Sequence, residues 1–194
     1  MALRMAKHED IPQMLAIYAP YVENTTYSFE YTVPTLAEFT QRFESYTTQF
    51  PWLVWEEQGQ VLGYAYGSAP FERTAYRWCA ESSVYLHPDA HRKGIGKKLY
   101  TALEKLLQLQ GYRVNYALIT SENQISLAFH EALGYRYVAD MKQQGYKHGR
   151  WLGVVWMEKV LNLLENPDKF PIPLTEIVKD NRNLQDILDN LPLS

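Results

Sequence analysis

The feature that most constrains this chain is an apolar strand that runs through a short glycine loop directly into a helix, over residues 84–100. Gly94 and Gly96 have no Cβ, so the backbone can turn tightly there and present the unpaired N–H groups of the first helical turn to an anion. Basic residues surround the loop: Arg92, Lys93, Lys97 and Lys98. The sequence therefore predicts a phosphate-binding site at the start of this helix.

Nucleotides, dinucleotides and coenzyme A can all be held by a glycine loop, and the spacing narrows the choice. A kinase-type phosphate loop needs Gly-Lys-Ser/Thr, whereas two lysines follow Gly96 and no hydroxyl is placed to reach magnesium. A dinucleotide fingerprint needs a third glycine, but Leu99 stands at that position, even if Glu122 is counted as a distant ribose-binding acid. Both nucleotide interpretations are therefore poor.

Composition favours a folded, soluble protein. With 194 residues, 46% of them hydrophobic, one domain with a sizeable core is expected, and a formal net charge of −3 gives no field that would attract nucleic acid or an anionic membrane. No apolar run approaches the roughly 20 residues that span a bilayer, and the charged residues 1–10 contain no apolar leader, so we expect a cytoplasmic protein. The lone cysteine, Cys79, excludes an intrachain disulfide and a cysteine-cluster metal site.

Hydrophobic periodicity predicts a mixed α/β domain over residues 1–160, with strands and helices that alternate after the glycine loop. Strands are expected at 3–7, 51–57, 61–67, 76–86 and 114–119, and helices from Asp10, from Pro34, after the glycine loop as far as Gly111, and at 125–133. Residues 161–194 form a C-terminal extension. Three prolines interrupt its 166–178 part, and its 183–191 part is expected to be a short amphipathic helix. That helix can pack on its own chain, cap a dimer or fray.

The Gly94-Ile95-Gly96 motif between a strand and a helix resembles the GNAT N-acetyltransferase family, with His91 where arginine or glutamine is usual. A closer resemblance, over about residues 3–160, is to the phosphinothricin and methionine sulfone acetyltransferase subgroup. Five segments carry it in order: NTTYSFEYTVPT, PWLVWEEQGQVLGYAY, AYRWCAESSVYL, FHEALGY and GYKHGRW. The resemblance implies a central, mixed but mostly antiparallel, twisted sheet of about seven strands flanked by helices, with a V-shaped splay between the central strands.

The resemblance also implies the reaction, in which acetyl-CoA donates an acetyl group to the amine of a small amino-acid-like substrate, with no metal and commonly in a homodimer. A protein or peptide N-acetyltransferase remains an alternative, although that activity favours an open, often acidic groove, whereas the aromatic content and Arg73 suggest a closed pocket that binds a carboxylate. A non-catalytic CoA-binding domain is a third possibility.

Two residues are candidates for proton transfer. An amine is mostly protonated at neutral pH, so a base is needed, and Glu81 lies on the strand that leads to the glycine loop. The alternation of a strand places Glu81 on one face with Ser83 and Tyr85, and the resemblance assigns the base to this glutamate. It also gives an active-site role to His130, as an acid, a second base or a substrate contact.

Coenzyme and acceptor contacts follow from the resemblance. Main-chain hydrogen bonds from Val84, Tyr85 and Leu86 to the pantetheine and thioester are implied, the pyrophosphate is expected at residues 92–97 (Arg92, Lys93, Gly94, Ile95, Gly96, Lys97), and Asn123 is a cofactor contact, a helix cap or both. The implied acceptor residues are Phe29, Arg73, Tyr76, Ser83 and Tyr85, with Arg73 binding the carboxylate. Phe71 replaces a basic residue of the herbicide-detoxifying relatives, which disfavours a phosphinate. Gly145 and Gly149 are expected to be turn residues of a substrate-side loop.

Overall fold

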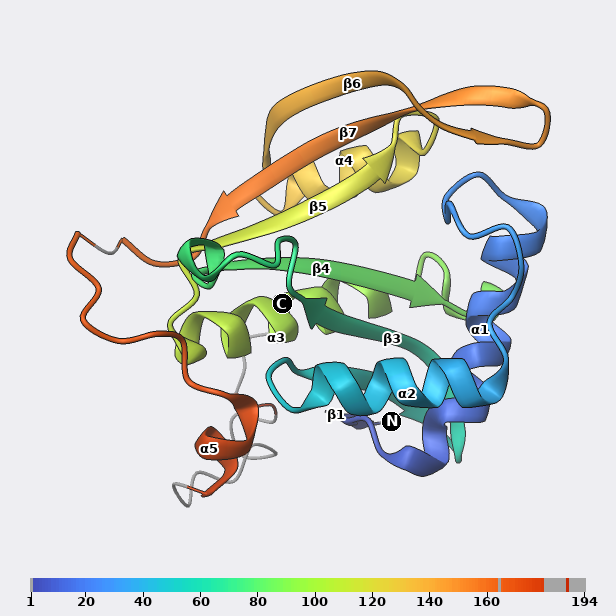
Figure 1. Cartoon of the computed structure of the whole chain (residues 1–194). Helices are drawn as coiled ribbons and strands as arrows, with labels where there is room; N and C mark the ends of the chain where they lie inside the picture. Colours follow the sequence, from blue (N-terminus) through green and yellow to red (C-terminus); the bar gives the residue numbers. More distant parts are fainter. Residues whose placement is uncertain (1, 164, 180–187, 189–194) are drawn as a thin grey trace.

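A single seven-stranded sheet organises the computed structural model, which describes residues 2–163, 165–179 and 188 (Figure 1). Its strand order is β1-β2-β3-β4-β5-β7-β6, and every neighbouring pair is antiparallel except β4 and β5. The strands are β1 Ala2–Met5, β2 Trp52–Glu57, β3 Gln60–Ser68, β4 Cys79–Leu86, β5 Val114–Thr120, β6 Arg136–Lys147 and β7 Arg150–Val160. The predicted sheet is confirmed in strand number and in its mostly antiparallel pairing.

Helices cover both faces of the sheet, as predicted. On one face α1 (Ile11–Asn24) and α2 (Leu36–Thr47) pack against β2 and β3 through an aromatic core that includes Tyr18, Phe39 and Trp52. On the other face lie α3 (Ile95–Gln110) and α4 (Gln124–Ala132), whose buried leucines pack on strands β3 to β7. The two faces of β4 therefore belong to different cores.

Local sequence signals explain where most elements begin and end. Gln58 and Gly59 both have positive φ and form the turn between β2 and β3. Thr35 caps α2 together with Glu38, so this helix begins just after Pro34, and Gly111 ends α3 with φ 95°.

The central strands β4 and β5 pair over only three residues, Cys79–Glu81 with Val114–Tyr116, and then separate. Because β4 stays paired with β3 as far as Leu86, it follows one arm of a V while β5, β6 and β7 form the other. The predicted splay is therefore present, and it starts at Glu81.

Two boundaries differ from the sequence prediction. The strand expected from Tyr76 begins at Cys79, because Thr74–Tyr76 form a 3-10 turn with the N–H of Tyr76 bonded to the carbonyl of Arg73. Gly145 was expected in a turn but lies inside β6, and the turn consists of His148 and Gly149, both with positive φ.

The C-terminal extension follows β7 and docks on the same domain. Phe170 packs against Trp78, the N–H of Ile172 donates to the carbonyl of Gln110, and Leu174 at the start of α5 (Leu174–Lys179) is buried. The helix predicted at 183–191 lies outside the described residues, apart from the buried Leu188. No helix in the described part of the chain is both long and apolar enough to cross a membrane.

Candidate active site

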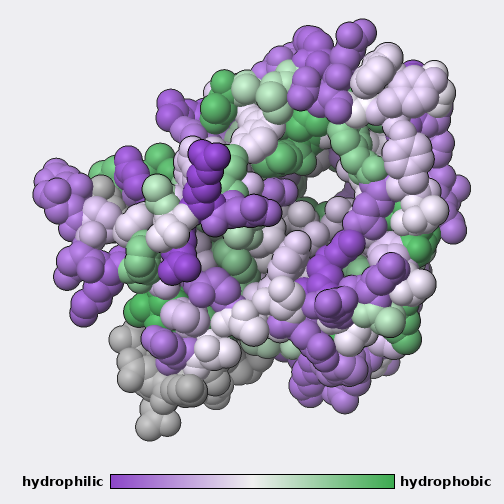
Figure 2. Space-filling model, viewed as in Figure 1, coloured by the Kyte–Doolittle hydropathy of each residue, from purple (hydrophilic) through white to green (hydrophobic). Residues whose placement is uncertain are grey.

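The splay between β4 and β5 leaves a cleft in the middle of the molecule. It is lined from both arms of the V, by Tyr21, Tyr27, Ser82, Ser83, Val84, Tyr85, Ala117, Leu118, Ile119, Thr120, Asn123, Ser126 and His130. Figure 2 shows an opening that passes between the two arms. The side chains and main-chain groups along this cleft are therefore accessible to a ligand.

The edge of β4 that faces the cleft has no strand partner beyond Glu81. The N–H of His87 donates to Leu62 of β3, and the alternation of strand hydrogen bonds then turns the main-chain groups of Tyr85 toward β3 and those of Val84 and Leu86 toward the cleft. Tyr85 is therefore not available for the predicted main-chain contact. At Leu86 the Tyr21 hydroxyl donates to the carbonyl (2.8 Å) and accepts from the N–H (3.3 Å), so a ligand there has to exchange these bonds.

The glycine loop forms one end of this edge. Gly94 is the N-cap of α3 with φ 75°, and its carbonyl accepts from the N–H of Lys98 at 3.1 Å. A Cβ on Gly96 would lie 3.2 Å from the Leu86 side chain, so glycine lets the first helical turn approach β4 closely. Ile95 is buried and holds this turn in the core, while Arg92 and Lys93 are exposed. The first N–H groups of α3 and two cations thus remain directed to solvent for an anion.

Glu81 stands at the closed end of the V, where β4 leaves β5. Its carboxylate makes no hydrogen bond or ion pair with any residue that the structure describes. Burial raises the pKa of this carboxyl above its usual value, because the charged form is poorly solvated there. An unpartnered carboxylate with a raised pKa is a suitable proton acceptor for an amine.

His130 is buried on the other arm, with 3% of its surface exposed. Its Nδ1 lies 2.7 Å from the carbonyl oxygen of Ser126, which can only accept, so Nδ1 carries the proton. Burial lowers the pKa of the ring, which is therefore neutral near pH 7, and Nε2 accepts from the Tyr100 hydroxyl at 2.9 Å. In this arrangement both ring nitrogens of His130 are already hydrogen-bonded. The ring has no free proton to donate, and Tyr100 donates the hydrogen bond to Nε2.

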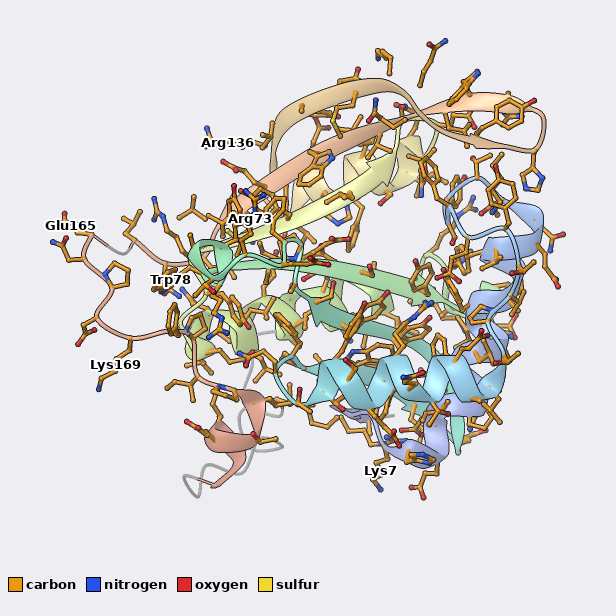
Figure 3. All side chains as sticks on the ribbon, viewed as in Figure 1. Lys7, Arg73, Trp78, Arg136, Glu165 and Lys169 are labelled. Atoms are coloured by element: carbon orange, nitrogen blue, oxygen red, sulfur yellow. The ribbon has the colours of Figure 1, made fainter. Side chains whose placement is uncertain are left out.

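Arg73 and Tyr76 lie in the turn that precedes β4, and Glu81 is the third residue of that strand. Figure 3 shows Arg73 beside the start of β4. Arg73 is exposed and has no charged partner within the described residues. Beside it Phe71 contacts Tyr76 at 4.6 Å between ring centroids and stacks on Trp156 at 5.8 Å. A cation next to an aromatic surface suits a ligand with a carboxylate and an uncharged side chain.

The other predicted acceptor residues are spread along the cleft. Ser83 pairs with Tyr66 of β3, and the Tyr85 ring packs between Tyr18 and Tyr64 in the aromatic core. Both Ser83 and Tyr85 are among the residues that line the cleft. Phe29 lies away from Arg73, against Gly145 of β6. The structure thus brings Glu81, Arg73 and Tyr76 to one end and Phe29 to the other.

Comparison with known proteins identifies the family. The Acetyltransferase (GNAT) domain model matches residues 3–156. The chain belongs to the GNAT acetyltransferase family. It is 35% identical to the phosphinothricin N-acetyltransferase of Streptomyces viridochromogenes, over 90% of this chain and 95% of that protein. It is 40% identical to the L-methionine sulfoximine/L-methionine sulfone acetyltransferase of Pseudomonas paraeruginosa, over 84% and 94% of the two chains.

A solved relative shows the same fold with the coenzyme. The phosphinothricin acetyltransferase of Sinorhizobium meliloti in complex with AcCoA superposes with a TM-score of 0.80 at 40% identity, covering 88% of this chain and 92% of that one. The protein is accordingly an N-acetyltransferase that uses acetyl-CoA. No group of metal-ligating side chains occurs among the residues placed by the structure.

The features of this acetyltransferase fit acetyl-CoA. The unpaired carbonyl of Val84 can accept from an amide of a pantetheine arm, and the start of α3 can hold the phosphates of the coenzyme. Asn123 caps α4 through the N–H of Ser126 at 3.1 Å and also lines the cleft, so both predicted roles remain compatible.

Sequence reasoning missed three tyrosines of the acetyltransferase site: Tyr21 on Leu86, Tyr27 in the cleft lining and Tyr100 on His130. Tyr100 lies on the apolar face of α3, where its spacing indicates only a core residue. Tyr21 and Tyr27 lie at and beyond the end of α1, and nothing local in the sequence shows that this part of the chain reaches β4. Only the tertiary contact reveals these roles.

Proposed function

We propose that this enzyme transfers the acetyl group of acetyl-CoA to the amine of a small amino acid with an uncharged polar side chain, of the methionine sulfone or methionine sulfoximine type. The observation that carries the proposal is the unpartnered Glu81 carboxylate at the same end of the sheet as an exposed arginine and an aromatic surface. The substrate class, a small amino acid or analogue, is supported by relatives that are named as acetyltransferases of phosphinothricin and of L-methionine sulfoximine and sulfone.

The residues divide the reaction between them. Acetyl-CoA supplies an activated acetyl group and a thiolate leaving group. Glu81 takes a proton from the amine, directly or through a water, as the new C–N bond forms and the C–S bond breaks. The N–H of Val84 faces the cleft and is a donor for the negative charge that develops on the carbonyl oxygen.

His130 serves this reaction through its hydrogen bonds. Its neutral ring accepts from the fully buried Tyr100 hydroxyl and donates to the Ser126 carbonyl, so neither side chain has a proton for the departing sulfur, and the thiolate takes its proton from solvent. We therefore assign His130, which lines the cleft, a positioning role rather than direct donation.

Phe71 separates the acceptor candidates. The phosphinate of phosphinothricin carries a second negative charge, and Phe71 offers it an aromatic ring already packed on Tyr76 and Trp156. A neutral sulfone or sulfoximine needs no second cation. Methionine sulfone is therefore expected to be the better acceptor.

Release of free thiol from acetyl-CoA tests the proposal. The assay uses methionine sulfone, methionine sulfoximine, phosphinothricin, unmodified amino acids and a panel of peptides at equal concentration. Turnover with the first two at the highest kcat/KM is expected. A preference for peptides supports the protein acetyltransferase instead, and no turnover with any amine overturns the enzymatic assignment.

A further inference from the structure

Residues 22–31, here called the bridging segment, connect the two arms of the V at its open end (Figure 1). By sequence the segment follows α1, on the arm of β3 and β4, but several of its contacts are to the other arm. The carbonyl of Thr26 accepts from the Thr120 hydroxyl at 2.8 Å, and the Thr26 hydroxyl donates to Glu122 at 3.1 Å. The Tyr31 hydroxyl donates to the carbonyl of Tyr146.

Lys147, the last residue of β6, is the most deeply buried charged contact of this segment, with 4% of its surface exposed. Its Nζ donates to the carbonyl of Val22 and to the carbonyl of Ser28, both at 2.7 Å. An ammonium without such partners would be strongly unfavourable at this depth. The two acceptors lie at the end of α1 and beyond the bend that follows, so one side chain holds both ends of the bend.

Neighbouring contacts extend this anchor to the cleft. The Ser28 hydroxyl lies 2.7 Å from the Tyr18 hydroxyl in the aromatic core, which fixes the same residue from the other side. Two residues before Lys147, a Cβ on Gly145 would lie 2.4 Å from the Phe29 ring, so glycine is needed to seat that ring on β6. Between these points Tyr27 lines the cleft. One strand therefore holds the main chain and an aromatic side chain of the bridging segment.

We propose that Lys147 is a positioning residue for acetyl transfer, which fixes the bridging segment so that Tyr27 lines the cleft at its open end, opposite Glu81. The inference rests on the proposed function, because it takes the acceptor to be a small molecule held between Tyr27 and the Glu81 end. Lys147 does not touch the reacting atoms. It acts through the two carbonyls that it binds.

Lys147→Met tests this role, because methionine keeps a flexible apolar stem and removes the three N–H donors. The matched control is Lys142→Met on the same strand, where the lysine is exposed and forms an ion pair with Asp140. Lys147→Met is expected to raise the KM for methionine sulfone about tenfold, as loss of acceptor positioning predicts, with the KM for acetyl-CoA unchanged. Equal increases in both KM values, or no change in either, overturn the proposal.

Hydrogen–deuterium exchange supplies a readout that does not depend on turnover. Peptides that cover residues 22–31 are expected to exchange faster in Lys147→Met and not in Lys142→Met, and unchanged exchange in the folded variant contradicts the anchor. If Lys147→Met does not fold, Lys147→Gln, whose amide can still reach one carbonyl, is measured with the same expected direction. If the wild-type enzyme turns over no amine, the proposed function and the catalytic part of this inference fail together, and the exchange experiment alone decides whether Lys147 fixes the segment.

Discussion

At the scale of single residues, the most testable group is the half-buried, unpartnered carboxyl of Glu81. Burial raises its pKa, so kcat/KM is expected to increase with pH as the carboxylic acid loses its proton. Glu81→Gln should lower kcat by roughly 10²–10⁴ at neutral pH and remove this step from the pH profile. Steady-state kinetics between pH 4.5 and 8 measure both effects.

The control for Glu81 is Glu131→Gln, which changes an exposed glutamate on α4. Titration of acetyl-CoA should give the same affinity for both variants and for the wild type. A Glu81→Gln enzyme that retains its rate excludes this residue as the base.

The buried His130 ring predicts a pH-dependent stability. Its pKa is lowered in the folded protein, so as the pH falls the unfolded chain binds a proton at a higher pH than the folded protein does. The free energy of unfolding should therefore fall as pH drops below about 6.5, the usual histidine value. Urea unfolding at pH 7.5, 6 and 5 should show a smaller decrease for His130→Gln than for the wild type. Parallel curves for the two proteins would contradict a neutral buried ring.

Phe71 predicts substrate preference. Phe71→Lys places a second cation beside Arg73, so the kcat/KM for phosphinothricin relative to methionine sulfone should rise about tenfold. Phe71→Leu, which removes the ring without adding charge, is the matched control and should not show this shift. Competition between the two acceptors measures the ratio of kcat/KM values directly. An unchanged ratio in Phe71→Lys would mean that the phosphinate does not bind beside residue 71.

At the scale of elements, the glycine loop before α3 separates a backbone effect from a binding effect. Gly94 and Gly134 both have positive φ, and a Cβ at either position would meet no atom within 4 Å. Alanine at each should therefore destabilise the fold by a similar amount, about 1 kcal/mol. Only Gly94→Ala should also raise the KM for acetyl-CoA, because only that glycine shapes the start of α3. Thermal melts and steady-state kinetics on both variants check this. Equal KM values for acetyl-CoA in the two variants would mean that the phosphates do not bind at the loop.

Elements were predicted well where one local signal dominates. The turn at Gln58 and Gly59, the apolar spacing of α3 and the glycine that ends it each act within a few residues. The sequence predicts Gly145 in a turn, because it does not show which side chain packs against that glycine. A glycine is needed at this strand position because the ring of Phe29, more than a hundred residues earlier in the chain, packs against it.

The site was predictable to a similar extent. Glu81 and Ser83 share a face because strands alternate, and this follows from the sequence. The partnership of Tyr100 with His130, and of Tyr21 with Leu86, requires elements that are distant in sequence to meet. For the same reason the sequence assigns no role to Lys147, whose two carbonyl partners lie more than a hundred residues earlier in the chain.

At the scale of the whole molecule, the two arms of the V are joined at both ends. At one end β4 pairs with β5 as far as Glu81, and at the other Lys147 holds the bridging segment. The aromatic core under α1 and α2 and the leucine core under α3 give each face of β4 its own support. The arms can therefore stay apart in the middle without a strand between them.

A cleft closed at both ends is a ring, and the opening in Figure 2 passes through it. In the proposed reaction the phosphates bind at the glycine loop, on the α3 face of β4, whereas the alternation of the strand directs Glu81 to the opposite face. The two reactants would then approach from different sides and meet inside the ring. Neither would block the entrance of the other, so the proposal predicts that the fold imposes no order on their arrival or on the departure of the products.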